Sequence, residues 1–378
     1  MRKALFALVA AGLMTSVTLT ACDDGSGSGD SSDDTSTSNV SVSITGKGRN
    51  GVGVILPDLK TSARWGKDDP NYLKAAFEKA NVPYEIKNAE GDKEAFKAIA
   101  DKMLDGGVKV LVIANLDSAS GKAVIDNAHA RKIPVIDYDR LTLNGNADYY
   151  VSFNNEQVGI QQAQGLMSCM QAKAASGKPV VAELNGSPTD NNATLFKDGY
   201  DSILQTKYDN GEFTKGPDQF VPEWDNDEGK AIFTQMLKQW PNIDGVLAAN
   251  DGLGNAAIEV LRTKRLNGKV PVTGQDATVQ GLQNILVGDQ CMTVYKATKK
   301  EAEAAADLAI GIVKGQKKTA NDKVKDPETG AYVPSVLLIP TPITAGKVKS
   351  LVTEGYVTTK ELCTPKFVAK CEQYGVLK

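Results

Sequence analysis

Short apolar runs recur along this 378-residue chain, and each of them ends in polar side chains. Residues 133–136 lead directly into Asp137, Tyr138, Asp139 and Arg140. The same arrangement recurs at residues 52–56, 108–114, 180–184, 243–249, 270–274 and 292–295. A continuous apolar run of this length is typical of a parallel strand that is buried on both faces. Ligands of open α/β sheets bind outside the carboxyl ends of the strands, so the repeated polar ends predict one polar cleft.

Amphipathic helical segments separate these runs, and the alternation forms two successive series. The first series covers residues 52–153 and the second covers residues 156–286. Alternating strands and helices are typical of parallel βαβ units. Three return segments follow, which we predict to be a strand at residues 292–295, a helix at residues 300–314 and a strand at residues 336–339. The pattern therefore predicts two similar lobes, each built on a doubly wound parallel sheet.

The return segments imply that the chain crosses between the lobes three times, through a three-strand hinge. We place the crossings near residues 152–155, 290–292 and 336–340. The predicted N-terminal lobe comprises residues 47–153 and 293–336, and the predicted C-terminal lobe comprises residues 154–292 and 337–378.

Length and composition agree with a two-lobed globular protein. A chain of 378 residues favours two domains over one. Apolar residues make up 41% and charged residues 24%, which excludes fibrous and wholly disordered classes. The formal net charge of -3 provides no basic surface for nucleic acid, so we predict no nucleic-acid partner.

The N-terminus has the pattern of an export signal. A short basic segment, Met1-Arg2-Lys3, precedes an apolar run at residues 4–17. The run ends at Leu19-Thr20-Ala21-Cys22, which resembles a bacterial lipobox whose cleavage leaves Cys22 as the lipidated first residue. Residues 22–46 are rich in Ser, Asp, Gly and Thr, a composition that predicts a flexible tether. The alternative is an ordinary secreted protein that is cleaved elsewhere.

The cysteine count agrees with export. If Cys22 carries a lipid, four of the five cysteines remain for two disulfides. We predict a short loop closed by Cys363 and Cys371, which leaves Cys169 to pair with Cys291. Four buried free thiols are the alternative.

Two tryptophans mark candidate carbohydrate contacts. A sugar site needs charged and amide groups for the hydroxyls and rigid aromatic rings for the C–H faces. Trp65 follows Arg64, and Trp224 lies between Glu223 and Asp225, so both indoles are predicted in polar loops. Trp240, at a predicted helix end, is interpreted as packing.

Six sequence blocks, in order, resemble the D-xylose-binding proteins of bacterial ABC importers, within the wider group of ribose, glucose and galactose receptors. The blocks are Leu59-Lys60 with Arg64-Trp65, Tyr138-Asp139-Arg140, residues 186–193 (GSPTDNNA), Ala249-Asn250-Asp251, Gly274-Gln275-Asp276-Ala277 and Thr293-Val294-Tyr295-Lys296. The resemblance implies a periplasmic-binding-protein type I fold that closes on a monosaccharide. It also implies nine ligand-binding residues: Arg64, Trp65, Asp139, Arg140, Asn192, Trp224, Asn250, Asp276 and Lys296.

The roles expected of these residues follow from their chemistry. Arg140 and Asp276 are expected to bind ring hydroxyls through charge-assisted hydrogen bonds. Asn192 and Asn250 are expected to use both ends of their amides, and the two indoles to cover the faces of the sugar. Lys296 is expected to face the cleft from the first lobe.

These observations predict a substrate-binding lipoprotein of an ABC sugar importer. Its expected ligand is xylose, with glucose or another aldose as the alternative, and its expected partner is a permease in the cytoplasmic membrane. We expect a monomer anchored by lipid to the outer face of that membrane, without enzymatic activity, cofactor or metal. A sugar receptor for chemotaxis or a sensor kinase is a further alternative.

Other functions are less consistent with the sequence. Residues 252–257 (GLGNAA) have the form of a dinucleotide-binding motif, but a single match of this kind is weak evidence. Asp139 and Asp276 in one cleft could form the acid–base pair of a secreted glycosidase. The one histidine, His129, makes histidine-based zinc sites and Ser-His triads implausible. A transcriptional regulator would need a basic DNA-reading segment at the N-terminus, where the chain has a signal and a tether.

Overall fold

The computed structural model describes residues 49–377. The predicted signal segment, the candidate lipidation site Cys22 and the predicted tether lie outside the described residues. Within residues 49–377, no helix combines the length and apolar character required to cross a bilayer.

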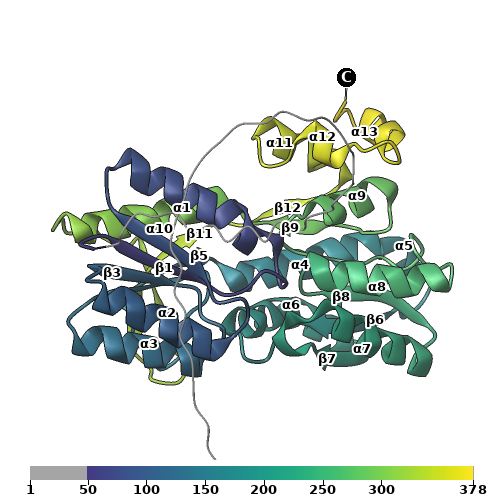
Figure 1. Ribbon diagram of the computed structural model, residues 1–378. Helices are drawn as coiled ribbons and strands as arrows, with labels where there is room; N and C mark the ends of the chain where they lie inside the picture. The colour runs from purple at the N-terminus through teal and green to yellow at the C-terminus, as the bar shows by residue number, and fades with distance from the viewer. Residues whose placement is uncertain (1–48, 378) are drawn as a thin grey trace, which may run out of the picture. The chain divides into compact units, whose positions relative to one another are not determined.

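The first lobe is built on a seven-stranded sheet (Figure 1). Its strand order is β10 (Asp322–Lys325), β11 (Tyr332–Leu338), β5 (Tyr149–Phe153), β4 (Val135–Tyr138), β3 (Val110–Ile113), β1 (Val52–Leu56) and β2 (Tyr84–Asn88). All neighbouring strands are parallel except β10, which runs antiparallel to β11. The central strands β1, β3 and β4 are buried along their whole length, as the continuous apolar runs predict.

Helices cover both faces of this sheet. Helices α1 (Asp68–Lys79) and α10 (Thr298–Val313) pack on one face, and α2 (Lys93–Asp105) and α3 (Ser118–Ala130) pack on the other. Successive residues of each strand point to opposite faces, so Val54 contacts the first pair of helices and Ile55 the second. Asp92 and Asp117 cap the amino ends of α2 and α3 with their side chains. Both caps belong to the carboxyl edge of the sheet, where the site is built.

The second lobe contains a smaller parallel sheet. Its order is β7 (Thr214–Phe220), β6 (Val180–Asn185) and β8 (Ile243–Ala248). The helices of this lobe are α4 (Asn155–Cys169), α5 (Gln171–Ser176), α6 (Asn191–Asp209), α7 (Asn226–Gln239), α8 (Asp251–Thr263) and α9 (Val279–Val287). The strand predicted at residues 270–274 is reduced to a single bridge between Val246 and Val272, although Val270 and Val272 are buried in the core as expected.

Strands β9 and β11 correct the predicted lobe boundaries. Strand β9 (Thr293–Tyr295) pairs with β12 (Thr341–Ile343) and bridges to Gln275, so it lies with the second lobe and not with the first. The second crossing therefore follows β9, instead of preceding it at residues 290–292. Similarly, β11 pairs with β5 as far as Leu338, so the first lobe extends past residue 336 and the third crossing falls at the end of the predicted stretch 336–340. The apolar pattern located both strands, but only the backbone pairing shows which lobe each belongs to.

Residues 345–376, which we call the C-terminal cap, form a separate small core. The cap contains the 3₁₀ turn η3 (Ala345–Lys347) and helices α11 (Val348–Thr353), α12 (Thr359–Leu362) and α13 (Val368–Gln373). Its apolar side chains pack against α9 and against Tyr295 of β9. A disulfide between Cys363 and Cys371 closes it, as predicted.

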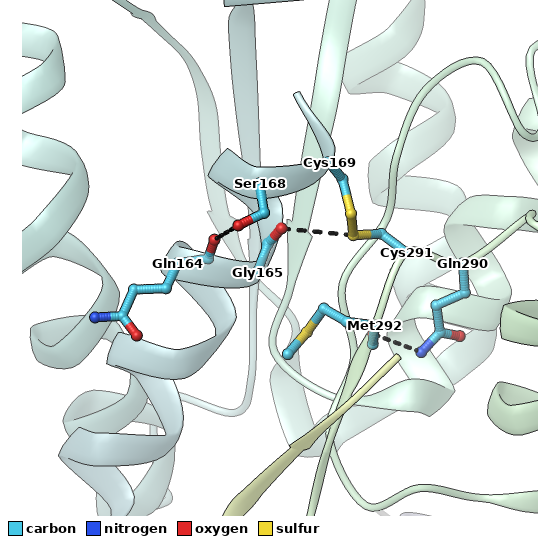
Figure 2. Close-up of a disulfide and its surroundings, with 7 residues drawn as sticks. All are labelled: Gln164, Gly165, Ser168, Cys169, Gln290, Cys291 and Met292. Carbon is cyan, nitrogen blue, oxygen red and sulfur yellow. Dashed lines mark hydrogen bonds between the residues drawn. A yellow bond between two sulfur atoms is a disulfide. The ribbon is translucent and has the colours of Figure 1, made fainter. Parts of the chain in front are cut away.

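The second disulfide joins Cys169, at the end of α4, to Cys291, just before β9 (Figure 2). This pairing is also the one predicted. Gly165 lies one turn earlier in α4, and a Cβ there would come 2.7 Å from the Met292 side chain. The glycine thus allows the segment before β9 to approach the helix, and the disulfide holds it there.

We expect the two disulfides to differ in their effect on stability. Cross-links that close longer loops restrict the unfolded chain more. Cys169 and Cys291 are 122 residues apart and Cys363 and Cys371 are 8 apart. Replacing the first pair by alanine should lower the free energy of unfolding by roughly 4–5 kcal/mol, and replacing the second pair by roughly 2–3 kcal/mol. Urea unfolding of both double variants measures these losses, and the reverse order would contradict the prediction.

Candidate functional site

A small cavity lies between the two lobes, at the carboxyl ends of their strands. It has about 40 Å³ of free volume and opens toward an outer chamber of about 1020 Å³. The nine residues predicted to bind ligand all line the cavity. Thr61, Ser62, Asp190, Phe196 and Gln275 complete its wall. Because so little space is free, a ligand larger than a few water molecules must move these side chains apart, which hinge motion between the lobes permits.

Asp139 is the centre of the polar network. Its carboxylate accepts hydrogen bonds from Arg64 Nη1 at 2.8 Å and from Lys296 Nζ at 3.2 Å. From the second lobe, Asn192 Nδ2 donates to Oδ1 of Asp139 at 3.0 Å. Tyr150 and Ser152 donate to the backbone carbonyl of the same residue at 3.1 and 2.8 Å. One carboxylate thus contacts both lobes and the crossing segment.

Arg64 anchors the first lobe's side of the cavity. The residue belongs to the 3₁₀ turn η1 (Ala63–Gly66). It forms a two-point ion pair with Asp69, at 2.8 and 2.7 Å, and a contact of 2.5 Å with Glu301 of α10. Its guanidinium lies 4.2 Å from the ring centroid of Trp65. These contacts fix both the cation and the indole before any ligand binds.

Arg140 contacts the second lobe directly. Its Nε lies 3.2 Å from Oδ2 of Asp190, and its Nη1 donates to the carbonyl of Asn115 at 3.0 Å. The turn after Arg140 is held by Asp137, which accepts bonds from the amide and hydroxyl of Thr142. Asp326, in the turn between β10 and β11, supports the same region, because its carboxylate accepts a bond from the amide of Asn144 at 2.7 Å.

The two asparagines differ from their expected roles. Asn192 uses both ends of its amide within the protein, since Nδ2 donates to Asp139 and Oδ1 accepts from Asn155 at 2.8 Å. Asn250 caps α8, and its Oδ1 accepts from the amide of Leu253 at 2.8 Å. The Nδ2 end of Asn250 is the end left for a ligand.

Both site tryptophans are more buried than the predicted polar loops imply. Trp65 lies in η1 and Trp224 in the 3₁₀ turn η2 (Pro222–Trp224), with exposed fractions of 3% and 6%. Trp224 donates from Nε1 to Asp190 at 3.1 Å and packs edge-on against Phe196. A Cβ on Gly186 would come 2.0 Å from the indole, so a glycine is required at this position for the ring to occupy its place. Trp240 is 37% exposed and lies outside the cavity.

Lys296 and Asp276 form the remaining wall. Lys296 lies at the crossing between β9 and α10, not within the first lobe as expected, and its Nζ is 3.8 Å from Oδ1 of Asp276. Three residues of the cavity wall, Asp139, Trp224 and Asp276, have positive φ angles of 63°, 57° and 96°. Such conformations are unfavourable for residues other than glycine and are frequent at binding sites.

The buried charges change one another's pKa values. Burial by itself would raise the pKa of Asp139, but Lys296, Arg64 and Arg140 outweigh it and hold that pKa well below its usual range. Burial raises the pKa of Asp276. Burial also raises the pKa of Glu301 to about 8, although Arg64 acts in the opposite direction. At neutral pH the cavity therefore holds an ionised Asp139, and the site retains a proton on Glu301 behind it.

Glu301 should make stability depend on pH. Its pKa is about 8 in the folded protein and about 4.5 in the unfolded chain, so the folded state binds more protons between these values. The free energy of unfolding should fall as pH rises from about 5 to 8, by up to about 1.4 kcal/mol per pH unit from this group. Asp137 and Asp251, whose pKa values burial raises to about 7, contribute with the same sign.

Glu301→Gln should therefore reduce this slope without removing it. Glu303→Gln, an exposed change on the same helix, should leave the slope unchanged. Urea unfolding of both variants at several pH values measures the slopes, and equal slopes in Glu301→Gln and the unsubstituted protein would contradict the assignment.

The sequence did not identify five of the lining residues as site residues. Asp190 belonged to a recognised block but was given no role; in the structure it caps α6 and accepts from the amide of Asn192 at 2.9 Å. Phe196 lay outside the six blocks. The motif at residues 252–257 lies within α8, and a Cβ at Gly252 would meet the side chain of Asn226, so that glycine packs against α7. Among residues 49–377, no group of three or more candidate ligands could hold a metal ion.

Comparisons with known proteins agree with this architecture. The family model described as "Periplasmic binding protein domain" matches residues 52–317. The chain is 33% identical to the D-xylose-binding periplasmic protein of Escherichia coli over 317 residues, which cover 82% of this chain and 92% of the relative. It is 31% identical to the multiple sugar-binding periplasmic receptor ChvE of Rhizobium radiobacter, over 80% of this chain and 89% of the relative.

A solved structure shows the same fold. An ABC transporter solute-binding protein of Clostridium phytofermentans, with bound β-D-glucose, has a TM-score of 0.76 and 26% identity, over 82% of this chain and 99% of that one. These findings confirm the predicted resemblance and the type I fold class. The chain belongs to the periplasmic binding protein family.

Proposed function

We propose that this protein is the substrate-binding component of an ABC importer and that it binds a monosaccharide, xylose or a related aldose, between its lobes. One observation carries the proposal: ionised groups, amides and two indoles from both lobes converge on a single cavity. Concave sites with aromatic walls and a few convergent polar groups are typical of small-ligand binding. The relatives named above are sugar-binding proteins by name, which supports the same ligand class.

The proposed binding mode assigns a part to each group. The carboxylates of Asp139 and Asp276 accept from sugar hydroxyls, while Arg140, Lys296 and the free Nδ2 of Asn250 donate to hydroxyl and ring oxygens. The indoles of Trp65 and Trp224 cover the apolar C–H faces. A sugar that replaces the direct contacts between the lobes, such as Arg140 with Asp190, favours the closed form by contacting both lobes at once.

We infer a binding protein in preference to a glycosidase from the family to which the chain belongs and from the electrostatics of Asp139. A retaining or inverting glycosidase needs one carboxylic acid that keeps its proton near the working pH. Asp139 contacts Arg64 and Lys296, and its pKa is depressed. Asp139 is therefore a poor general acid. Burial raises the pKa of Asp276, so the inference against an Asp276 acid rests on the family and on the xyloside control below. The family is one of binding proteins and not of enzymes, which agrees with this inference.

The site of action follows from the family and from the N-terminal sequence. Proteins of this family are exported, and export fits residues 1–21. We propose that Cys22 carries the lipid anchor and that the loaded protein delivers its sugar to a permease in the cytoplasmic membrane. Labelling with a radioactive fatty acid in a bacterial host, with Cys22→Ala as the control, tests the anchor; equal labelling of both would contradict it.

Titration calorimetry tests the ligand class. The full chain without its signal segment should bind at least one of xylose, glucose, galactose and arabinose with a stoichiometry of one. Sucrose and an aryl β-xyloside serve as controls for size and for turnover. Absence of binding to all four monosaccharides, or release of the aryl group from the xyloside, would contradict the proposal.

A further inference from the structure

The C-terminal cap contacts the loop that carries Asp276, and the binding mode above makes no use of that contact. Tyr356, which follows α11, donates from its hydroxyl to the backbone carbonyl of Asp276 at 2.8 Å. Its ring packs against Tyr295 of β9, with ring centroids 4.7 Å apart. Tyr356 does not line the cavity, so any influence on a ligand is indirect, and its hydrogen bond leads to Asp276.

The Asp276 loop has a backbone that needs external support. Asp276 and Ala277 are consecutive residues other than glycine with φ angles of 96° and 52°. Residues in these conformations persist only where surrounding contacts hold them. On one side, β9 supplies two such contacts: Val294 accepts from the Asp276 amide at 2.9 Å, and Thr293 Oγ1 accepts from the Ala277 amide at 3.2 Å.

Tyr356 supplies the contact on the other side of the same peptide. Its hydroxyl makes the one hydrogen bond that the Asp276 carbonyl receives within residues 49–377. The carbonyl direction fixes the rotation of the backbone between Asp276 and Ala277, and the rotamers open to the Asp276 side chain depend on that backbone conformation. That side chain has its Oδ1 3.8 Å from Lys296 Nζ in the cavity wall.

The cap also contacts the first lobe. Glu361, in α12, lies 3.3 Å from Lys67, which directly follows the turn that carries Arg64 and Trp65. The Glu361 carboxylate is fixed by its own capping box with Thr358. The cap therefore lies against both the Asp276 loop and the element that presents the first lobe's aromatic wall, and the Cys363–Cys371 disulfide follows Glu361 directly.

We propose that Tyr356 is a positioning residue for the sugar site: its hydroxyl holds the Asp276 backbone so that the carboxylate meets a sugar hydroxyl. The C-terminal cap then contributes to sugar binding by supporting the Asp276 loop. This inference rests on the proposed function, because it concerns the affinity for the sugar that the cavity binds.

Tyr356→Phe tests the role of the hydroxyl and keeps the ring packing. The sugar that binds most tightly in the calorimetric series is the probe. Tyr356→Phe should raise its dissociation constant about five- to tenfold. The matched control is Tyr374→Phe in the same cap, because the Tyr374 hydroxyl makes no hydrogen bond within the described residues; this variant should bind as the unsubstituted protein does.

A double-variant cycle separates positioning from general stability. In an Asp276→Ala background no carboxylate remains to be positioned, so adding Tyr356→Phe should leave the dissociation constant unchanged within twofold. Tryptophan fluorescence, titrated to saturation, measures the weaker affinities. The inference is overturned if Tyr356→Phe binds normally, or if it weakens binding by the same factor with and without Asp276. If the unsubstituted protein binds no monosaccharide, the proposed function itself fails, and that outcome is seen before any variant is made.

Discussion

Asp139→Ala is expected to weaken sugar binding at least 100-fold. The substitution removes a carboxylate that is ionised, buried and aimed into the cavity, and charge-assisted hydrogen bonds are the stronger class. It also removes a partner from Arg64 and from Lys296, which remain buried. Leaving a buried cation short of a partner costs roughly 3 kcal/mol or more of folding stability. Calorimetry and urea unfolding measure the two effects.

Asp139→Asn separates the two effects of this change. The amide keeps the shape of the side chain and one acceptor oxygen, but it removes the charge. We expect a smaller loss of stability than in Asp139→Ala together with a loss of affinity of at least tenfold. Asp126→Ala, which removes an exposed ion pair with Lys122 on α3, is the control and should alter neither quantity measurably. Sugar binding by Asp139→Ala with unchanged affinity would exclude Asp139 from the site.

Trp224→Ala is expected to weaken sugar binding at least tenfold. The variant loses the indole that faces the cavity and leaves a space beside Gly186 and Phe196. Removing a buried tryptophan also destabilises a protein by roughly 3–5 kcal/mol, so binding must be measured at a temperature where the variant is folded. Trp240→Ala is the matched control, because that indole is partly exposed and lies outside the cavity.

Gly186→Ala provides a second test of the same indole. The added Cβ would lie 2.0 Å from the ring, so the ring must move while the tryptophan itself is retained. We expect a loss of affinity in the same direction as for Trp224→Ala. Normal sugar affinity in both variants would show that the indole makes no contact with the ligand.

Much of the site was predictable because the fold places strand ends together. The runs at residues 133–136, 243–249 and 292–295 predicted strands, and Asp139, Arg140, Asn250 and Lys296 after them do converge on one cavity. Apolar periodicity reflects which face of a strand or helix is buried, and this pattern lies within the sequence of each segment. The cysteine pairing was predictable because few cysteines are present and two of them are near neighbours in sequence.

Other features were hidden because they depend on contacts between distant segments. The lobe to which β9 belongs is decided by its pairing with β12, almost fifty residues later. The burial of Trp65 depends on Tyr138 and Arg64, whose positions no local pattern reveals. Glu301 was assigned no role from the sequence, yet it is fully buried and contacts Arg64.

The same applies to Tyr356. Its distance from Asp276 along the chain is 80 residues, and a tyrosine after a short helix has no pattern that distinguishes a positioning residue from a core residue. Only the packing of the cap on β9 brings the two together. Tertiary contacts of this kind determine how a site is supported, even where sequence blocks identify the residues that line it.

The decisive experiment is a crystal structure of the protein with bound xylose, or with the aldose that calorimetry selects. We expect one sugar between the lobes, with its hydroxyls within hydrogen-bond distance of Asp139, Arg140 and Asp276 and a ring face against Trp224. A sugar bound elsewhere on the molecule, with these four side chains in contact with one another and not with it, would show that the cavity between the lobes is not the sugar site.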